Sequence, residues 1–182
     1  MLLASPYVLL AAAAVLVFWM VGAHNRLVAL RNAMVEAWAR IDEALKARAA
    51  AAVPLLAALR EPLAAEQGAL DTVQAALNES TRASGAMGSR PVSQDHASAW
   101  MAAESGLSAA ATRLFALLDQ QPELRLQDHV AMGTAAWREA NARLAFARQV
   151  FNEAAEVYNG AIALFPTRLL VPMLRFGPAG RL

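Results

Sequence analysis

The sequence contains no cysteine among its 182 residues, so disulfides, thiolate nucleophiles and cysteine-bound metals are excluded. Its histidines, His24, His96 and His129, are scattered along the chain, and none belongs to the Glu-x-x-His pairs that helical di-iron sites require. No Gly-rich phosphate loop follows a strand-like segment either. We therefore expect no catalytic residues, no metal and no cofactor, and we predict that the protein is not an enzyme.

An excess of charge of one sign is also missing, because the net charge is only +1. A chain this close to neutrality offers no electrostatic case for binding nucleic acid. Strand-forming residues are sparse and do not alternate with polar ones, whereas alanine, a strong helix former, is abundant. The composition predicts an all-α fold.

The first 23 residues form a long apolar run that no lysine or arginine precedes. From Val8 to Ala23 there is no polar side chain, and about 20 apolar residues in a helix cross a hydrocarbon core about 30 Å thick. A cleaved signal peptide would need a basic start and small residues at the cleavage site, where the sequence has Trp19 to Val21. We predict that residues 1–23 are an uncleaved, single-pass transmembrane anchor.

Positive charges follow this segment rather than precede it, namely Arg26, Arg31 and Arg40. By the positive-inside rule, the rest of the chain is predicted to lie in the cytoplasm.

Helical periodicity continues to about residue 165 and is broken in few places. Pro54 is expected to bend or interrupt the first helix, and Gly85, Gly88 and Pro91 predict a loop over about 80–98, with Asp95 or Ser98 capping the next helix. Residues 24–165 are thus predicted to form an elongated antiparallel four-helix bundle with two long and two shorter helices. The expected helices are about 24–60, 62–82, 99–120 and 124–165.

The last helix carries a heptad pattern. One row is large and should be buried: Val130, Trp137, Leu144, Phe151, Tyr158 and Phe165. A second row is small or polar until its end: Thr134, Asn141, Arg148, Ala155 and Ile162. A third row of small residues, from Gly133 to Ala161, should let another helix backbone approach closely, while Glu153 should face water.

An inward charge needs a partner, so Arg148 is predicted to pair with an acid such as Asp42 or Glu36. The alternative is that Asn141 and Arg148 form a polar seam for a ligand. Asn152 and Asn159, each following an aromatic residue, are interpreted as amide clips beside an aromatic core.

Residues 166–182 form an apolar and basic tail. Antiparallel passes would return this tail to the membrane side, where it could lie in the bilayer interface or close the open end of the bundle. The side chains expected to contact the membrane are Arg168, Leu170, Leu174, Arg175 and Phe176.

Residues 25–48 resemble the opening of the LemA family, in which a membrane helix precedes an Asn-x-Leu-Val-x-Leu-Arg-Asn stretch. The matching residues include Asn25, Leu27, Leu30, Arg31, Asn32, Glu36, Trp38, Ile41, Asp42, Leu45, Lys46 and Arg48. Later matches are Pro122, Leu124, Asn141, Arg148, Asn152, Tyr158, Asn159, Phe165 and Pro166. The chain resembles a divergent member, because alanines replace family residues before Pro54 and Phe151 replaces a tyrosine.

The resemblance implies a bacterial, membrane-anchored helical bundle without established catalytic activity. We expect a scaffold or adaptor at the inner membrane that acts by binding protein. The alternatives are a membrane-shaping or envelope-stress structural protein that assembles with copies of itself, and an accessory subunit of a membrane protease or transporter. The expected partners are the lipid bilayer, an unidentified protein and possible further copies of the chain, but no nucleic acid.

Overall fold

The computed structural model describes residues 6–165, 167–169, 171 and 176–182, and every regular element among them is helical. The elements are α1 (Pro6–Leu59), η1 (Ala64–Glu66), α2 (Gln67–Ser89), α3 (Gln94–Asp119), α4 (Pro122–Arg125), α5 (Asp128–Ala163) and η2 (Thr167–Leu169). The all-α class and the two long and two shorter helices of the predicted bundle are confirmed.

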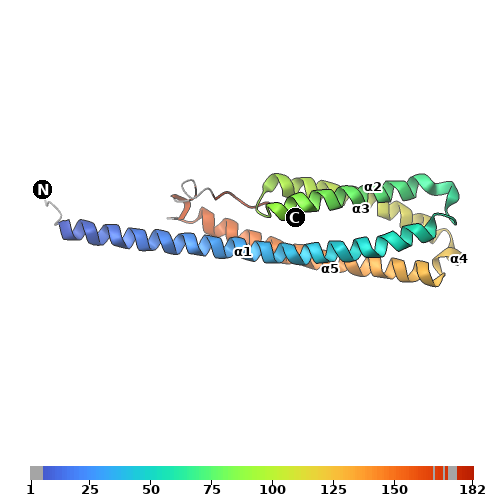
Figure 1. Cartoon of the computed structure of the whole chain (residues 1–182), viewed down its shortest axis with the longest axis horizontal. Coiled ribbons are helices and arrows are strands. Elements are labelled where there is room, and N and C mark those ends of the chain that lie inside the picture. Colours follow the sequence, from blue (N-terminus) through green and yellow to red (C-terminus); the bar gives the residue numbers. More distant parts are fainter. Residues whose placement is uncertain (1–5, 166, 170, 172–175) are drawn as a thin grey trace.

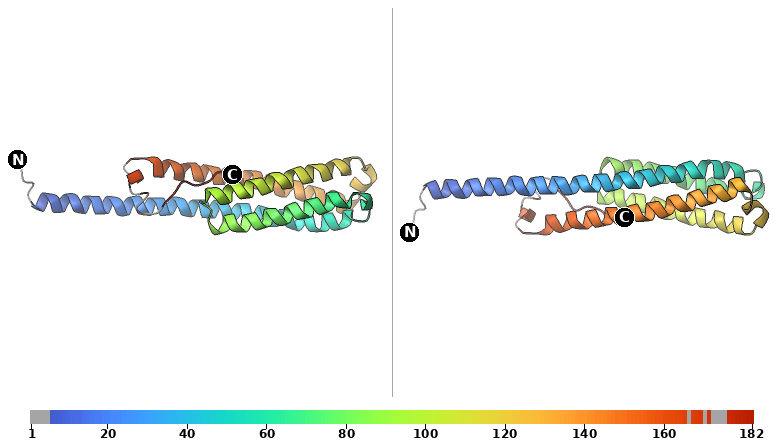
Figure 2. Two further views of the ribbon diagram at one scale, coloured as in Figure 1. Left: turned by 90° about the horizontal axis from the view of Figure 1, so that it is seen from above. Right: turned by 90° about the horizontal axis from the view of Figure 1, so that it is seen from below.

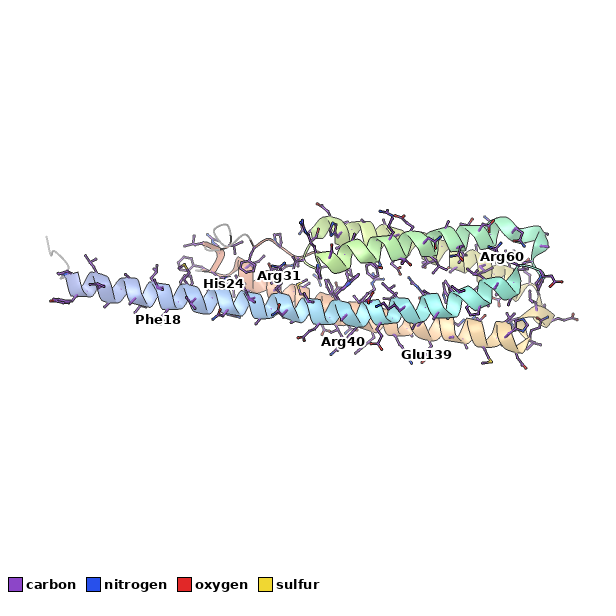
Figure 3. The ribbon with its side chains drawn as sticks, in the orientation of Figure 1. Phe18, His24, Arg31, Arg40, Arg60 and Glu139 are labelled. Carbon is purple, nitrogen blue, oxygen red and sulfur yellow. The ribbon has the colours of Figure 1, made fainter. Side chains whose placement is uncertain are left out.

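Helix α1 is a single helix of 54 residues that joins the apolar segment to the bundle without a break. Its most apolar stretch has a mean hydropathy of 2.1 and is not buried at all, so by length and composition it is a candidate membrane span. This part projects past the other helices, with Phe18 exposed on it (Figures 1 and 3). One continuous helix therefore runs from the apolar segment into the bundle.

Pro54 does not interrupt α1, which continues to Leu59, so the predicted interruption is wrong. A proline inside a helix leaves the carbonyl four residues earlier without its N–H partner. Here that residue is Ala50, which lies on the exposed side of α1, where water can bond the free carbonyl.

The bundle consists of two antiparallel pairs, α1 with α5 and α2 with α3 (Figures 1 and 2). Its core has two clusters, one at the end near the apolar segment and one at the far end. In the first, Trp38 packs edge-on against Trp100 and Phe151, with ring centroids 5.4 and 6.2 Å apart. Burying side chains of this size stabilises the fold by about 1.5–3 kcal/mol each.

The heptad pattern of α5 is confirmed from Val130 to Tyr158, because every member of the large row there is buried. Its last member, Phe165, is 74% exposed, and that part of the prediction is wrong. The helix ends at Ala163 and Leu164 is extended, so the helical repeat no longer orients the next side chain. Gly133 shows the expected close approach, since an added Cβ would lie 3.1 Å from Cβ of Leu55 on α1.

The predicted loop over 80–98 is wrong, because α2 continues to Ser89 and α3 begins at Gln94. Gly88 is needed for packing rather than for a turn, since an added Cβ would lie 2.9 Å from Nε1 of Trp38. The cap of α3 is Ser93, and neither Asp95 nor Ser98, because the Ser93 hydroxyl accepts a hydrogen bond from the His96 amide at 3.3 Å.

Candidate functional site: the groove between α3 and α5

A buried ion pair lies at the centre of the bundle. Arg48 of α1 and Glu104 of α3 are only 4% and 8% exposed. Two parallel hydrogen bonds join them, from Nη1 to Oε2 at 2.8 Å and from Nη2 to Oε1 at 2.6 Å. Arg48 also donates to Ser80 of α2 at 3.2 Å and to Asn141 of α5 at 3.3 Å, and the Ser80 hydroxyl donates to Glu104. This network therefore connects the four helices of the bundle, α1, α2, α3 and α5.

The charge of Glu104 is stabilised despite its burial. Burial alone raises the pKa of this carboxyl, but the hydrogen bonds and charge of Arg48 outweigh it, with smaller help from Ser80 and the Arg148 charge. The pKa of Glu104 consequently lies below its usual value, and the pair is ionised at neutral pH.

The network borders a groove between α3 and α5. The groove has a volume of about 1040 Å³, and Arg48, Glu104 and Asn141 are part of its lining. On the α3 side it is bordered by small polar residues, Ser105, Ser108 and Thr112. Because the helix pairs that pack most closely are α1 with α5 and α2 with α3, the α3 to α5 side of the bundle stays open.

Two arginines of α5 stand at the sides of this groove. The guanidinium carbon of Arg148 lies 5.7 Å from the ring centroid of Trp100, and that of Arg138 lies 5.9 Å from the ring centroid of Phe115. Arg148 also places Nη2 3.0 Å from the sulfur of Met101. Among the described residues, neither arginine forms a salt bridge with a carboxylate. Both positive charges therefore face the groove without an acidic partner in that part of the chain.

The predicted pairing of Arg148 with Asp42 or Glu36 is thus wrong. Asp42 pairs with Lys46 at 2.7 Å on the outer side of α1, and Glu36 is exposed. Arg148 lies on the side of α5 that faces α3, where it contacts Met101 and Trp100. The buried arginine is Arg48 instead.

Several buried polar atoms beside the groove have no hydrogen-bond partner among the described residues. They are Nε of Arg48, Nε1 of Trp137 and Oγ1 of Thr134. Arg48 and Trp137 both line the groove. These particular atoms are nevertheless sealed inside the bundle, so a molecule in the groove does not reach them directly.

The end of the chain folds back onto the bundle. We call residues 176–182 the strap. The side-chain amide of Asn159 donates to the Ala179 carbonyl at 3.0 Å and accepts from the Ala179 N–H at 2.7 Å. Asn152 holds Leu182 in the same way, at 2.5 and 2.7 Å. The amide clips predicted at these asparagines are therefore present, and what they hold is the backbone of the strap.

The spacing of the clips explains why the strap fits. Asn152 and Asn159 are seven residues apart, about 10.5 Å along a helix, and the residues they hold are three apart, about 10 Å in an extended chain. The Tyr158 hydroxyl donates to the Gly177 carbonyl at 2.9 Å, and burial raises the pKa of this tyrosine. Gly180 lies against α3, where an added Cβ would come within 3.0 Å of the Gln94 Cα.

The tail was predicted either to lie in the membrane interface or to close the bundle. Residues 176–182 do the second, and Phe176, only partly exposed, has its ring centroid 6.0 Å from that of His24. Arg168 is exposed, whereas Pro166, Leu170, Leu174 and Arg175 lie outside the described residues. Interface contact by Arg168, Leu170, Leu174 and Arg175 stays a prediction.

The other residues selected from the sequence fall into two groups. Trp38, Trp137, Phe151 and Tyr158 are buried core residues. On α1, Asn25, Arg31 and Glu36 are exposed and Leu30 is partly buried. The structure therefore does not gather these α1 positions into a site.

Sequence reasoning missed the central pair, although a signal existed. Arg48 continues the inward rhythm of Ile41, Ala44 and Leu55 on α1, and Glu104 lies in the buried stripe that contains Trp100 and Leu107. A charge of each sign on two inward stripes is the pattern that could have identified them.

The fold is that of an elongated helical bundle carried on one long helix with an apolar, projecting end. Among the described residues, no group of three or more His, Asp or Glu is placed to hold a metal ion. The LemA family model matches residues 37–181, which is most of the chain, so the protein belongs to the LemA family. A comparison with curated proteins gave no match.

Proposed function

We propose that the protein is a membrane-anchored, non-catalytic scaffold or adaptor that binds a partner protein in the groove between α3 and α5. The observation that carries this proposal is the groove itself, about 1040 Å³ in volume and bordered by arginines without a carboxylate partner among the described residues. The positive charge of Arg138 and Arg148, neither of which forms a salt bridge with a carboxylate among the described residues, favours a bound acidic partner over an empty surface.

The attachment of the bundle supports the same function. Because α1 is continuous from the apolar segment into the core, the groove is held at a fixed place relative to that segment. With residues 1–23 in a bacterial inner membrane, the exposed Arg31 and Arg40 after the anchor favour a cytoplasmic bundle (Figure 3). A rigid presentation of this kind suits an adaptor, which must hold its partner at a set position.

The test is an affinity pull-down of the full chain from native bacterial membranes, with two tryptophan variants compared. Ser108→Trp fills the groove, whereas Ala102→Trp adds the same bulk on an exposed part of α3 outside it. We expect one dominant partner that Ala102→Trp retains and Ser108→Trp loses.

Three other results would count against the groove as the adaptor site. Recovery of nothing, or of a partner that both variants retain, contradicts it directly. Recovery of further copies of the chain alone would favour the self-assembling alternative. If the partner is a membrane protease or transporter, the protein would be an accessory subunit of that complex.

A further inference from the structure

The strap and the groove occupy the same crevice. A second hollow of about 440 Å³, lined by Arg181 and Leu182 of the strap, shares Ala145 and Arg148 with the groove. The strap itself lies between α5, which holds it through Asn152 and Asn159, and the start of α3, which Gly180 contacts. The α3 to α5 crevice is therefore filled by an extended chain near the apolar segment and open farther away.

The strap also shows how an occupant is held in this crevice. It runs antiparallel to α5, because Asn159 holds Ala179 and the earlier Asn152 holds the later Leu182. The clips bind backbone atoms, and Ala179 and Gly180 are small. Recognition of this kind accepts an extended chain and makes few demands on side chains.

The length of the open half suits a short extended segment. From Trp137 to Arg148 the groove follows about 16 Å of α5, which an extended chain covers in about five residues.

The charges of the open half favour an acidic occupant. Glu104 is the acid of the lining, and Arg48 already neutralises it. Arg138 and Arg148 therefore leave the lining of this groove with a net positive charge, while Arg148 also adds to the stabilisation of the Glu104 charge and borders Glu153 and Glu156 in the second hollow. They are ten residues apart on α5, about 15 Å, which an extended chain covers in four to five residues.

We propose that the open half of the crevice binds an extended acidic segment of a partner protein, in line with the strap, with carboxylates opposite Arg148 and Arg138. This inference rests on the proposed adaptor function and specifies the chemistry of the partner. The carboxylates of the segment pair with the two arginines, and its backbone lies along the open half of the crevice.

The test attaches the occupant to the full chain itself. The chain contains no cysteine, so Ser108→Cys places a single thiol in the groove. An eight-residue, proline-containing segment is added after Leu182, with glutamates at its second and sixth positions, about where Arg148 and Arg138 lie along the line of the strap. The matched control has lysines at these positions. The full chain is kept in detergent or in vesicles.

The measurement is the alkylation rate of the Ser108→Cys thiol. A tethered segment acts at millimolar effective concentration, so we expect the acidic segment to slow alkylation about tenfold or more and the lysine control to leave it unchanged. Arg138→Gln combined with Arg148→Gln should abolish the protection. Because the extension could displace the strap, the same two sequences are also added as free peptides at millimolar concentration, and only the acidic one should protect.

Equal protection by the acidic and lysine segments, or none by either in both formats, would overturn the inference. So would protection that survives loss of both arginines, or stronger protection by an acidic, alanine-rich helical segment than by the proline-containing one. None of these results decides the adaptor function, which the pull-down tests separately.

Discussion

Replacing Arg48 by methionine should destabilise the bundle strongly at neutral pH, because Glu104 would stay buried without its cation. Breaking a buried ion pair in this way typically costs about 3–5 kcal/mol. The free energy of protonating Glu104 gives a similar value. In the variant Glu104 could take up a proton, which costs about 1.4 kcal/mol for each pH unit above the ordinary glutamate pKa near 4.3, or about 3.7 kcal/mol at pH 7. We expect a loss of about 3–4 kcal/mol.

The double variant Arg48→Met with Glu104→Leu removes both charges and fills their space with apolar groups. Such replacements of a buried pair are often neutral or stabilising, so the double variant should be more stable than Arg48→Met alone by about 3 kcal/mol. Ser80 and Asn141 lose partners in the double variant, which limits the recovery.

The stability lost in Arg48→Met should also depend on pH. Because the pKa of Glu104 is lowered in the folded protein, its stabilising contribution is present above its unfolded pKa and is lost as pH falls through the folded value. The difference between wild type and Arg48→Met should therefore shrink between pH 7 and pH 4. The measurement is urea unfolding of the full chain in detergent, followed by tryptophan fluorescence. A double variant as unstable as the single one, or a difference independent of pH, would refute the reasoning.

The remaining predictions concern the core, the strap and the topology. Trp137→Ala should cost about 3–5 kcal/mol in the same unfolding assay and Glu153→Ala less than about 0.5 kcal/mol, and equal losses would contradict the α5 assignment. Asn159→Ala removes two hydrogen bonds to the strap and should make an Ala179→Cys thiol, buried in the wild type, at least several times more reactive; unchanged reactivity would show that this clip does not hold the strap. A Ser89→Cys thiol should react with membrane-impermeant reagents only after the inner membrane is opened, and labelling of intact spheroplasts would place the bundle outside.

The periodic parts of the fold could be predicted from sequence because they depend on residues that repeat along one element. The buried row from Val130 to Tyr158 is such a case, since large side chains at heptad spacing determine which side of α5 faces inward. Phe165 fits the same pattern but lies past the end of the helix, because heptad spacing does not indicate where a helix ends.

The features that could not be predicted depend on contacts between distant residues. Gly88 has the local chemistry of a loop, but it lies in a helix, at a place where Trp38 of α1 leaves no room for a side chain. The pairing of Arg48 with Glu104 joins residues 56 positions apart, and heptad position alone does not identify the partner. The groove depends on the arrangement of whole helices, because it lies where α3 and α5 do not pack closely.

The unbroken course of α1 sets a height for the groove. With the membrane segment ending near Ala23, Arg48 lies 25 residues farther along the same helix, which places the groove roughly 35–40 Å from the edge of the hydrocarbon core when α1 stands upright. A partner tethered to the same membrane would need a linker of about 11 or more extended residues to reach it. Under the proposed function, the length of α1 would limit partners by their reach from the membrane as well as by their charge.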